Sequence, residues 1–333
     1  MGEAPAVIEV AGLKKYFPLP RRYPGQAAAR VHAVDDVSFT IARGETLSLV
    51  GESGCGKSTV GRTILGLTKP TAGEVRLDGV RIDNLPAGRL RPLRRRMQVV
   101  FQDPFSSLNP RLRVRDILAE PIANFALART RDEFAARIAR LLETVRLPAD
   151  AAGRFPHEFS GGQRQRIGIA RALATEPEVI ICDEAVSALD VSVKAQIVNL
   201  FADLQDELGL SLLFITHDLA IVEHLTHRVA VMYLGRIVEA ADRRSLFARP
   251  WHPYTQALLS AVPVPDPAAH RRRTILKGDV PSPVNLPSGC RFHTRCPHAF
   301  ARCRTEEPQL RPVGDGVGGA QWVACHLEAR PGG

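Results

Sequence analysis

Hydrophobic residues in this chain gather in short runs, several of which are followed by a segment with helical spacing. The clearest runs are Val179–Cys182, Leu212–Thr216 and Val229–Leu234, and each has the length of a buried strand. A helical stretch follows the first two. This alternation is typical of a parallel sheet covered by helices on both faces, so the sequence predicts an α/β fold.

The first third of the chain predicts further strands. We expect them at residues 7–11 and 37–50, where the second range consists of two apolar runs around the turn ARGE. Asp78 and Gly79 lie between two short apolar segments, and an Asp-Gly pair supplies the positive φ that a tight hairpin needs. The run MQVVF at 97–101 predicts one more strand.

The pattern then changes twice. From about Val114 to Val145 apolar residues recur at helical spacing, so a helical block interrupts the strands. After about Pro263 the segments VPVPDPAAHRRR and VPSPVNLPSG are too rich in proline for helices and have few residues to bury. We expect a linker that leads to a small terminal module at residues 279–326.

Composition and charge narrow the class of protein. Of the 333 residues, 45% are hydrophobic and 24% charged, as in a soluble globular protein, and no apolar run approaches the roughly 18 residues of a membrane span. The first residues, MGEAPAVIEV, lack the basic region and the apolar region of a signal peptide, so we expect a cytoplasmic location. The net charge of +9 comes from scattered arginines without interleaved aromatics, which favours a solvated surface over a nucleic-acid site.

A glycine-rich motif follows the apolar run that ends at Val50. The segment Gly51–Thr59, GESGCGKST, fits the pattern GxxxxGK[ST] and opens a helical run, which is the context of a phosphate-binding P-loop. Its glycines let backbone N–H groups approach phosphate, Lys57 reaches the β and γ phosphates, and Ser58 can ligate Mg²⁺. The motif predicts nucleotide binding.

Two carboxylates end the run VIICDE. Asp183 and Glu184 would lie at the edge where parallel sheets place their ligands. Asp183 could hold the water shell of a metal ion, while Glu184 could polarise a water molecule for attack on the γ phosphate.

A second glycine pair opens a basic amphipathic helix in FSGGQRQRIGIARAL. Gly161 and Gly162 after Ser160 predict another helix N-terminus that faces phosphate. A nucleotide already held by Lys57 does not need this second cradle from the same subunit. We therefore expect a dimer in which each subunit caps the nucleotide of the other.

Taken in order, these motifs resemble the ATP-binding subunit of an ABC transporter. The set is KKYF, the P-loop, VFQD, SGGQ, CDE, SALD and ITHD, and it covers residues 7 to about 240. The resemblance implies an ABC-type P-loop NTPase with a RecA-like parallel sheet core, an antiparallel β subdomain and an α-helical signature subdomain at about 105–172. The nucleotide-binding domain would span residues 1–262, with ATP as the substrate and Mg²⁺ as the cofactor.

The resemblance also implies roles for single residues. Phe17, or next best Tyr16, would stack on adenine. Gln102 would contact Mg²⁺ or the attacking water and couple to the membrane subunit, Glu184 would be the general base, and His217 would hold the γ phosphate and the base in place. The implied ATP contacts are Gly51, Ser53, Gly54, Cys55, Gly56, Lys57, Ser58 and Thr59 in the P-loop, together with Gly161 and Asp190. Ser160, Gly162 and Gln163 would bind the γ phosphate in the other protomer. Around Mg²⁺ it implies Ser58, Gln102 and Asp183.

The tail narrows the resemblance further. HPYTQALLSAVPVPDP and GDVPSPVNLPSGCRFHTRCPHA are similar to the C-terminal extension of oligopeptide and dipeptide ABC importers, so residues 263–333 would be a linker and such an extension. In that subfamily two ATPases, identical or paralogous, pair beneath two membrane permeases that an extracytoplasmic solute-binding protein feeds. The resemblance implies a peripheral subunit on the cytoplasmic face of the inner membrane, which hydrolyses ATP to drive import of di- or oligopeptides and has no nucleic-acid partner.

Four of the six cysteines lie in the tail, at Cys290, Cys296, Cys303 and Cys325. A cytosolic chain does not favour disulfides, and the spacing matches neither zinc ribbons nor ferredoxins, so free thiols, zinc and an iron–sulfur cluster all stay open. A segment so poor in apolar residues favours a ligand that holds it together. The peptide-importer resemblance favours a [4Fe-4S] cluster, with zinc as the alternative and His293, His298 and His326 as substitute ligands. Cys55 and Cys182 are expected to be packing residues.

Other functions fit parts of this sequence. A soluble ABC ATPase that acts on nucleic acid or ribosomes usually carries two cassettes or a long coiled coil, and neither is visible here. An importer of another small solute, such as nickel or glutathione, would share the same motifs. A catalytically idle subunit is disfavoured because Glu184 and His217 are both present.

Overall fold

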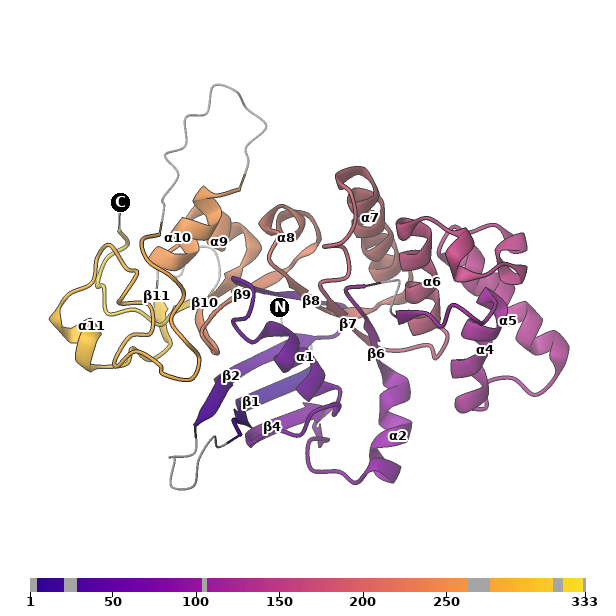
Figure 1. Cartoon of the computed structure of the whole chain (residues 1–333), viewed down its shortest axis with the longest axis horizontal. Helices are drawn as coiled ribbons and strands as arrows, with labels where there is room; N and C mark the ends of the chain where they lie inside the picture. The colour runs from indigo at the N-terminus through magenta and orange to yellow at the C-terminus, as the bar shows by residue number, and fades with distance from the viewer. Residues whose placement is uncertain (1–4, 21–28, 104–106, 263–275, 314–319, 332–333) are drawn as a thin grey trace. The chain divides into compact units, whose positions relative to one another are not determined.

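The computed structural model describes residues 5–20, 29–103, 107–262, 276–313 and 320–331 (Figure 1). The chain divides into a signature unit (residues 1–7, 41–46 and 84–215) and a P-loop unit (residues 8–40, 47–83 and 216–333). The proline-rich stretch 263–275, predicted as a linker, lies outside the described residues. The first two residues of the predicted helical subdomain, 105 and 106, lie outside them as well.

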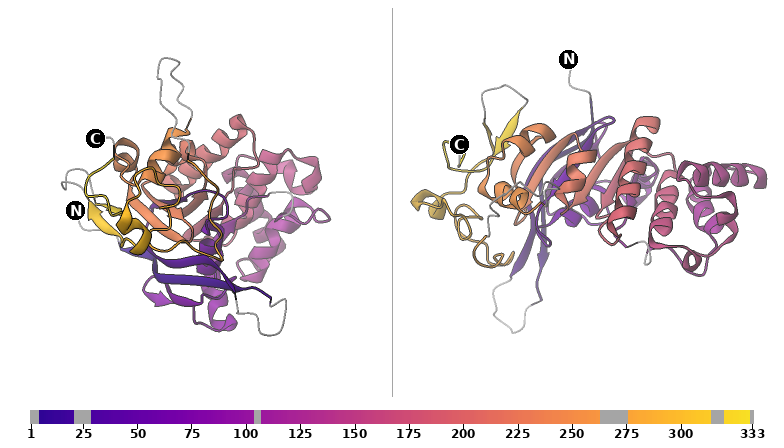
Figure 2. Two further views of the ribbon diagram at one scale, coloured as in Figure 1. Left: turned by 60° about the vertical axis from the view of Figure 1, so that its left-hand side comes forward. Right: turned by 90° about the horizontal axis from the view of Figure 1, so that it is seen from above.

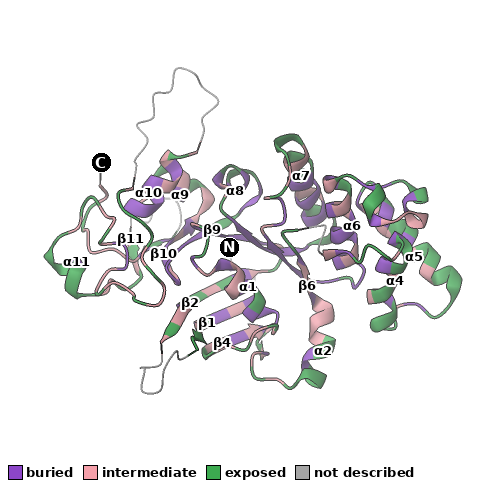
Figure 3. Ribbon diagram, viewed as in Figure 1, coloured by how far each residue is buried: buried purple, intermediate pink, exposed green. Residues whose placement is uncertain are grey.

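Parallel strands form the centre of the signature unit. They are β6 (Met97–Val100), β7 (Val179–Asp183) and β8 (Ser211–Thr216), in the order β8-β7-β6, with all but the last residue of β8 in this unit. Every residue of β7 and β8 is buried, which is why both read as nearly unbroken apolar runs (Figure 3). The predicted parallel strands at these positions are confirmed.

Helices make up the rest of the signature unit. They are α2 (Ala87–Arg96), α4 (Val114–Asn124), α5 (Arg131–Thr144), α6 (Gly161–Leu173) and α7 (Val191–Leu208), with 3-10 turns at Ala149–Gly153 and Pro156–Glu158. Among the described residues of the chain, no helix has the length and hydropathy needed to cross a membrane.

The predicted helical block at 114–145 is present as two helices. Helices α4 and α5 contact each other and α6, as Figures 1 and 2 show from several sides. The chain breaks between α4 and α5 because Ala126 takes a positive φ of 52° and Thr130 then caps α5, accepting a hydrogen bond from the Glu133 backbone N–H at 3.2 Å. The apolar spacing predicted the helices but not this break.

An antiparallel sheet belongs to the P-loop unit, apart from residues 6, 7, 41 and 42, which belong to the signature unit. Its order is β2-β1-β4-β5, with β1 at Ala6–Pro18, β2 at Arg30–Ala42, β4 at Ala72–Leu77 and β5 at Val80–Arg81. The predicted hairpin is confirmed, since Asp78 and Gly79 both have positive φ, 48° and 73°. Strands β1 and β2 are longer than predicted. Pairing with β4 extends β1 past its apolar residues as far as Lys14, across an irregularity after Ala11.

The second group of strands joins the P-loop to the tail. Strand β3 (Thr46–Val50) runs parallel to β9 (Arg228–Tyr233), which pairs in turn with β10 (Arg236–Asp242). The tail then adds β12 (Gln321–Val323) against β10 and β11 (Arg311–Val313) against β12. The helices of this unit are α1 (Lys57–Ile64), α8 (Leu219–Leu225), α9 (Arg243–Ala248), α10 (Pro253–Ser260) and α11 (Ala301–Thr305).

Aromatic packing also ties the tail to this unit. Phe292 from the cysteine-rich segment is 1% exposed and packs against Tyr233 of β9 and Tyr254 of α10, with ring centroids 5.3 and 5.5 Å away. The three rings belong to one buried cluster that includes Val50 at the end of β3. The tail therefore buries its few apolar residues in the core of the P-loop unit.

Candidate functional site

Two glycines of the P-loop, Gly51 and Gly56, lie where any side chain would clash. A Cβ on Gly51 would lie 2.2 Å from the Met232 carbonyl oxygen, and one on Gly56 would lie 1.9 Å from the Ala33 carbonyl oxygen. Gly51, Gly54 and Gly56 also have positive φ values of 152°, 80° and 109°. The loop is thus a close-packed backbone turn at the N-terminus of α1, the geometry that suits phosphate.

Lys57 is the first residue of α1 and is buried. Its Nζ donates to the carbonyl oxygens of Gly51 at 2.8 Å and Glu52 at 3.0 Å, so the ammonium group lies inside the loop. Ser58 and Thr59 follow it in the first helical turn and are half-buried, whereas Ser53 and Gly54 are exposed. Cys55 is buried, and this burial raises the pKa of its thiol, as expected for a packing residue.

The two aromatic candidates at the end of β1 differ in their surroundings. Tyr16 donates its hydroxyl to Asp35, and its ring centroid lies 4.4 Å from that of His32; burial and Asp35 raise its pKa to about 12. Phe17 is 38% exposed, with the Lys15 ammonium 4.8 Å from its ring centroid. Phe17 therefore has the ring that a planar ligand can reach.

In the signature unit, SGGQ forms the start of α6. The Ser160 hydroxyl accepts from the Gln163 N–H at 3.3 Å, and the Gln163 side-chain oxygen accepts from the Ser160 N–H at 3.1 Å. This reciprocal cap fixes the first turn of the helix. Both side chains are exposed, whereas Gly162 is buried: a Cβ there would lie 2.3 Å from Cγ1 of Val193.

Asp190 begins the neighbouring helix. Its side chain caps α7 by accepting from the Val193 N–H at 3.1 Å, and it is exposed. Val193 therefore touches both predicted features, the signature glycine and the Asp190 cap. Periodicity gave no sign of this contact.

The carboxylates lie at the end of β7, as predicted. Asp183 is buried, whereas Glu184 has a positive φ of 50°, which is rare for a residue with a side chain. The Glu184 N–H donates to the Ile215 carbonyl at 2.9 Å, and its own carbonyl accepts from the Ser187 N–H at 3.0 Å. Gln102, beyond β6, donates its Nε2 to Glu184 Oε2 at 3.0 Å. The structure thus joins two of the predicted catalytic side chains.

His217, the third predicted catalytic residue, directly follows β8. It is exposed, and the next residue, Asp218, caps α8 by accepting from the Ala220 N–H at 3.1 Å. It belongs to the P-loop unit, whereas Gln102 and Glu184 belong to the signature unit.

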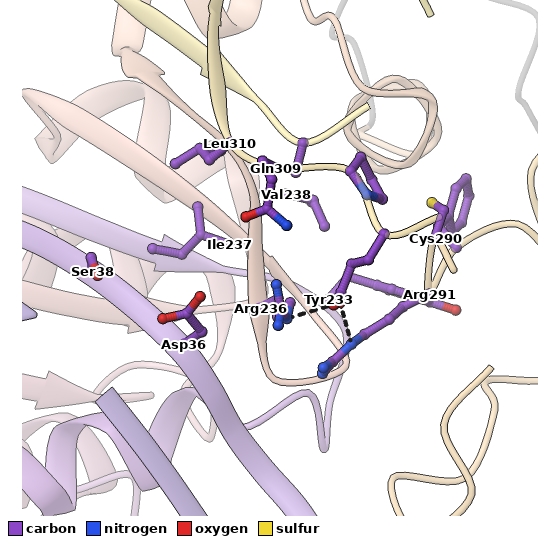
Figure 4. A pocket seen from close by; sticks show the side chains of 14 residues that line it. Asp36, Ser38, Tyr233, Arg236, Ile237, Val238, Cys290, Arg291, Gln309 and Leu310 are labelled. Atoms are coloured by element: carbon purple, nitrogen blue, oxygen red, sulfur yellow. Dashed lines mark ion pairs between the residues drawn. The ribbon is translucent and has the colours of Figure 1, made fainter. Parts of the chain in front are cut away.

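The tail residues form an ion-pair network beside β2 and β10. Arg291 is buried, pairs with Asp35 and donates to the Leu234 carbonyl at 2.5 Å, while Glu307 receives Arg236 at 3.0 Å and Arg291 at 3.4 Å. Arg236, Arg291 and Glu307 border a small cavity of about 160 Å³ (Figure 4). Burial alone would raise the pKa of Asp35, but hydrogen bonds from Tyr16 and Arg291 lower it, so Asp35 is ionised. The amino-acid sequence gave no sign of this network, because its residues are far apart along the chain.

Cys290, Cys296 and Cys303 share one segment and Cys325 follows β12, but the four side chains do not form a ligand group. The Cys290 N–H donates to the Cys303 carbonyl at 2.9 Å, and all six cysteines of the chain are free thiols. Burial, with the neighbouring thiols adding to it, raises the pKa of Cys290 to about 12 and that of Cys296 to about 11. Across the described residues, no set of three or more His, Cys, Asp or Glu side chains is placed to hold a metal ion. The structure therefore does not support the predicted [4Fe-4S] or zinc site, because sharing a segment did not bring the side chains into a ligand arrangement.

Comparison with known families gives two matches. The model described as ABC transporter matches residues 34–187, and the model described as oligopeptide/dipeptide transporter, C-terminal region, matches residues 238–303. The second match includes HPYTQALL and three of the four late cysteines.

Individual relatives cover nearly the whole chain. The chain is 56% identical to the probable peptide ABC transporter ATP-binding protein y4tS of Sinorhizobium fredii, over 97% of this chain and 90% of that protein. It is 50% identical to the oligopeptide transport ATP-binding protein AppF of Bacillus subtilis, over 96% of this chain and 97% of that protein. Among solved structures, the dimeric ATP-binding cassette MJ0796 bound to ADP and Pi has a TM-score of 0.63 at 29% identity, covering 71% of this chain and 99% of that one.

Proposed function

This chain belongs to the ATP-binding subunits of oligopeptide/dipeptide-type ABC transporters, and on that premise we propose that ATP lies between the Gly51–Thr59 loop of one subunit and the Ser160–Gln163 signature of another. The chain is an ABC-type ATPase that hydrolyses ATP to power the import of di- or oligopeptides. A soluble ATPase for nucleic acid or ribosomes, or an importer of nickel or glutathione, is not favoured.

The P-loop supplies the phosphate cradle in this proposal. Its support is the tight turn at Gly51 and Gly56, where any side chain would clash, together with the buried ammonium of Lys57. Lys57 would exchange its two loop carbonyls for the β and γ phosphates. Ser58 and Asp183, with Gln102, would hold Mg²⁺, which when bound neutralises charge on the phosphates.

Glu184 is the general base in this proposal, and its backbone conformation is the observation that carries the assignment. A positive φ at a glutamate costs about 1–3 kcal/mol and persists only where the surroundings over-determine it. Here the N–H and the carbonyl are both fixed, and Gln102 orients the carboxylate. Glu184 would accept the proton of the attacking water.

Residues from the remaining family motifs would complete the proposed site. Phe17, as the more exposed ring, would stack on adenine, with Tyr16 held by Asp35 beside it. His217 would contact the γ phosphate. From the other subunit the N-terminus of α6, with Ser160, Gly161, Gly162 and Gln163, would face the same phosphate, and Asp190 would lie next to it.

We further propose the assembly that the subfamily implies. A second ATPase subunit, identical or paralogous, would pair with this one beneath two membrane permeases, which receive peptides from an extracytoplasmic binding protein. The chain would then be peripheral, on the cytoplasmic face of the inner membrane. The family match to a peptide-transporter tail and the dimeric structural neighbour support this assembly.

A [4Fe-4S] cluster on Cys290, Cys296, Cys303 and Cys325 stays a proposal. Its support is the tail match and the mutual electrostatic influence of the thiols, which puts them in one neighbourhood. The side chains as they stand do not form a ligand set. No step of ATP hydrolysis depends on this cluster.

Replacing Glu184 with Gln tests the catalytic proposal. We expect hydrolysis to slow by about 10² to 10⁴, as loss of a general base implies, while ATP stays bound. Phosphate release and equilibrium ATP binding would be measured side by side. Glu207→Gln, which changes an exposed glutamate of α7 in the same unit, is the control. Unchanged turnover in the Glu184 variant would refute the assignment.

A further inference from the structure

Glu52 is an acidic residue at the second position of the P-loop, where a triphosphate is expected. Its carboxylate is part-exposed, yet no motif of the family uses its side chain in our assignments. Its carbonyl oxygen accepts the Lys57 ammonium at 3.0 Å. A contact that holds Glu52 in place therefore also holds the Lys57 ammonium group, which is proposed to contact the phosphates.

Arg295, in the cysteine-rich tail segment, holds the Glu52 carboxylate with two hydrogen bonds. Nη1 donates to Oε2 at 2.7 Å and Nη2 to Oε1 at 3.1 Å, and the arginine side chain is only 8% exposed. Paired bonds between a planar guanidinium and a carboxylate fix orientation as well as charge. The bonds to Glu52 raise the pKa of Arg295 further, so it carries its charge at every physiological pH.

Helix α10 holds the backbone of the same residue. The hydroxyl of Tyr254, in α10, accepts from the Glu52 N–H at 2.8 Å. The Tyr254 ring is fully buried and packs against Phe292, three residues before Arg295. The two contacts on Glu52 thus come from α10 and from the cysteine-rich segment, which pack against each other through Tyr254 and Phe292. Holding Glu52 is a role for the segment HPYTQALL that the sequence alone did not indicate.

We propose that Arg295 is a positioning residue of the ATP site: it neutralises Glu52 and holds the P-loop in the conformation that binds the triphosphate. The tail is then a structural part of the nucleotide site. This inference rests on the proposed binding of ATP at Lys57.

Two effects follow when Arg295 is removed. The Glu52 carboxylate stays beside the phosphates without its counter-charge, and the loop loses its side-chain anchor. The uncompensated Glu52 charge would repel the phosphates, so we expect about a tenfold rise in the dissociation constant for MgATP. Because Tyr254 still holds the backbone, the fold should survive.

The test is calorimetric titration of the purified full-length chain with MgATP, with the melting temperature measured without nucleotide. Arg295→Ala should raise the dissociation constant for MgATP about tenfold. Arg295→Lys, which keeps the charge but not the paired bonds, should raise it about threefold. Arg302→Ala is the matched control, because Arg302 makes the same two-bond pair with Glu306, 2.7 Å for each bond, in the same segment but at an exposed site. It should change binding less than about twofold.

A double variant separates the two effects and guards against misfolding. Adding Glu52→Gln to Arg295→Ala removes the unpaired charge and should recover part of the lost affinity. An affinity of Arg295→Ala within twofold of the parent, or an equal loss in Arg302→Ala, would overturn the inference. Lys57→Ala tests the premise separately: if it retains ATP binding, the P-loop assignment itself is wrong.

Discussion

Gly162→Ala probes the contact between the signature helix and the helix that follows Asp190. The added Cβ would lie 2.3 Å from Cγ1 of Val193, well inside van der Waals distance. Valine in a helix has one strongly preferred rotamer, so its side chain cannot turn away without cost. Either Val193 or the N-terminus of α6 must shift.

The magnitude follows from two opposing terms. Overpacking of this kind costs about 1–3 kcal/mol, while replacing glycine by alanine within a helix gains at most about 1 kcal/mol. We expect a net loss of about 0.5–2 kcal/mol in the free energy of unfolding, from the same two terms. ATP hydrolysis should fall more steeply, by up to about 10²-fold, because a displaced signature turn misplaces groups aimed at phosphate.

Thermal and denaturant unfolding, with phosphate release, provide the measurement. Gly168→Ala is the control: Gly168 lies in the middle of the same helix and has no atom within 4 Å of an added Cβ, so it should gain about 0.5–1 kcal/mol. Val193→Ala in the Gly162→Ala background should restore most of the loss. Two outcomes would contradict the proposed clash with Val193. One is that Gly162→Ala is as stable as Gly168→Ala, and the other is that Val193→Ala does not restore the stability of the Gly162→Ala protein.

Three further outcomes are expected. Arg96 pairs with Glu178 through bonds of 2.5 and 2.8 Å and lowers the pKa of Glu178 in the folded protein. The pair therefore stabilises the fold at a pH above the pKa that Glu178 has in the unfolded chain. This stabilisation is lost as the pH falls through the pKa of Glu178 in the folded protein. Glu178→Gln should therefore cost about 0.5–1 kcal/mol at pH 7 and nothing well below pH 4, in denaturant unfolding at both pH values; an equal cost at both pH values would contradict this. Anaerobically purified protein should carry iron and sulfide, and a colourless, iron-free preparation would rule out the proposed cluster. Affinity purification from native membranes should recover two permeases; recovery of ribosomes or DNA instead would contradict the proposed assembly.

Features that depend on neighbouring residues were predictable. The buried strands β7 and β8 each read as an apolar run, and Asp78-Gly79 reads as a hairpin turn, because each is set by local conformation and by side chains close in sequence. Phosphate binding by the P-loop stays a prediction. The family motifs then assigned Glu184 and Gln102. That the two side chains touch at 3.0 Å came only from the structure.

The tail was the least predictable part. Because the tail has few apolar residues, we expected a separate module that needs a ligand. Instead, Phe292 is buried in the core of the P-loop unit, and β12 pairs with β10 of that unit. A short apolar segment can be stable when it adds to an existing core, and sequence composition cannot distinguish that case from a separate module. The same holds for the four late cysteines. The sequence shows that they are close together along the chain, but not whether their side chains form a ligand set.

A P-loop, a strand-end carboxylate pair and a signature helix could be identified from the amino-acid sequence, because spacing within a few residues is enough to specify each motif. The side chains that support these motifs could be identified only in the folded chain. Arg295 and Glu52 are 243 positions apart, and Val193 reaches Gly162 from another helix. Such pairs form because chain topology brings distant segments together, and no local pattern of hydrophobic and polar residues records which partner each will meet.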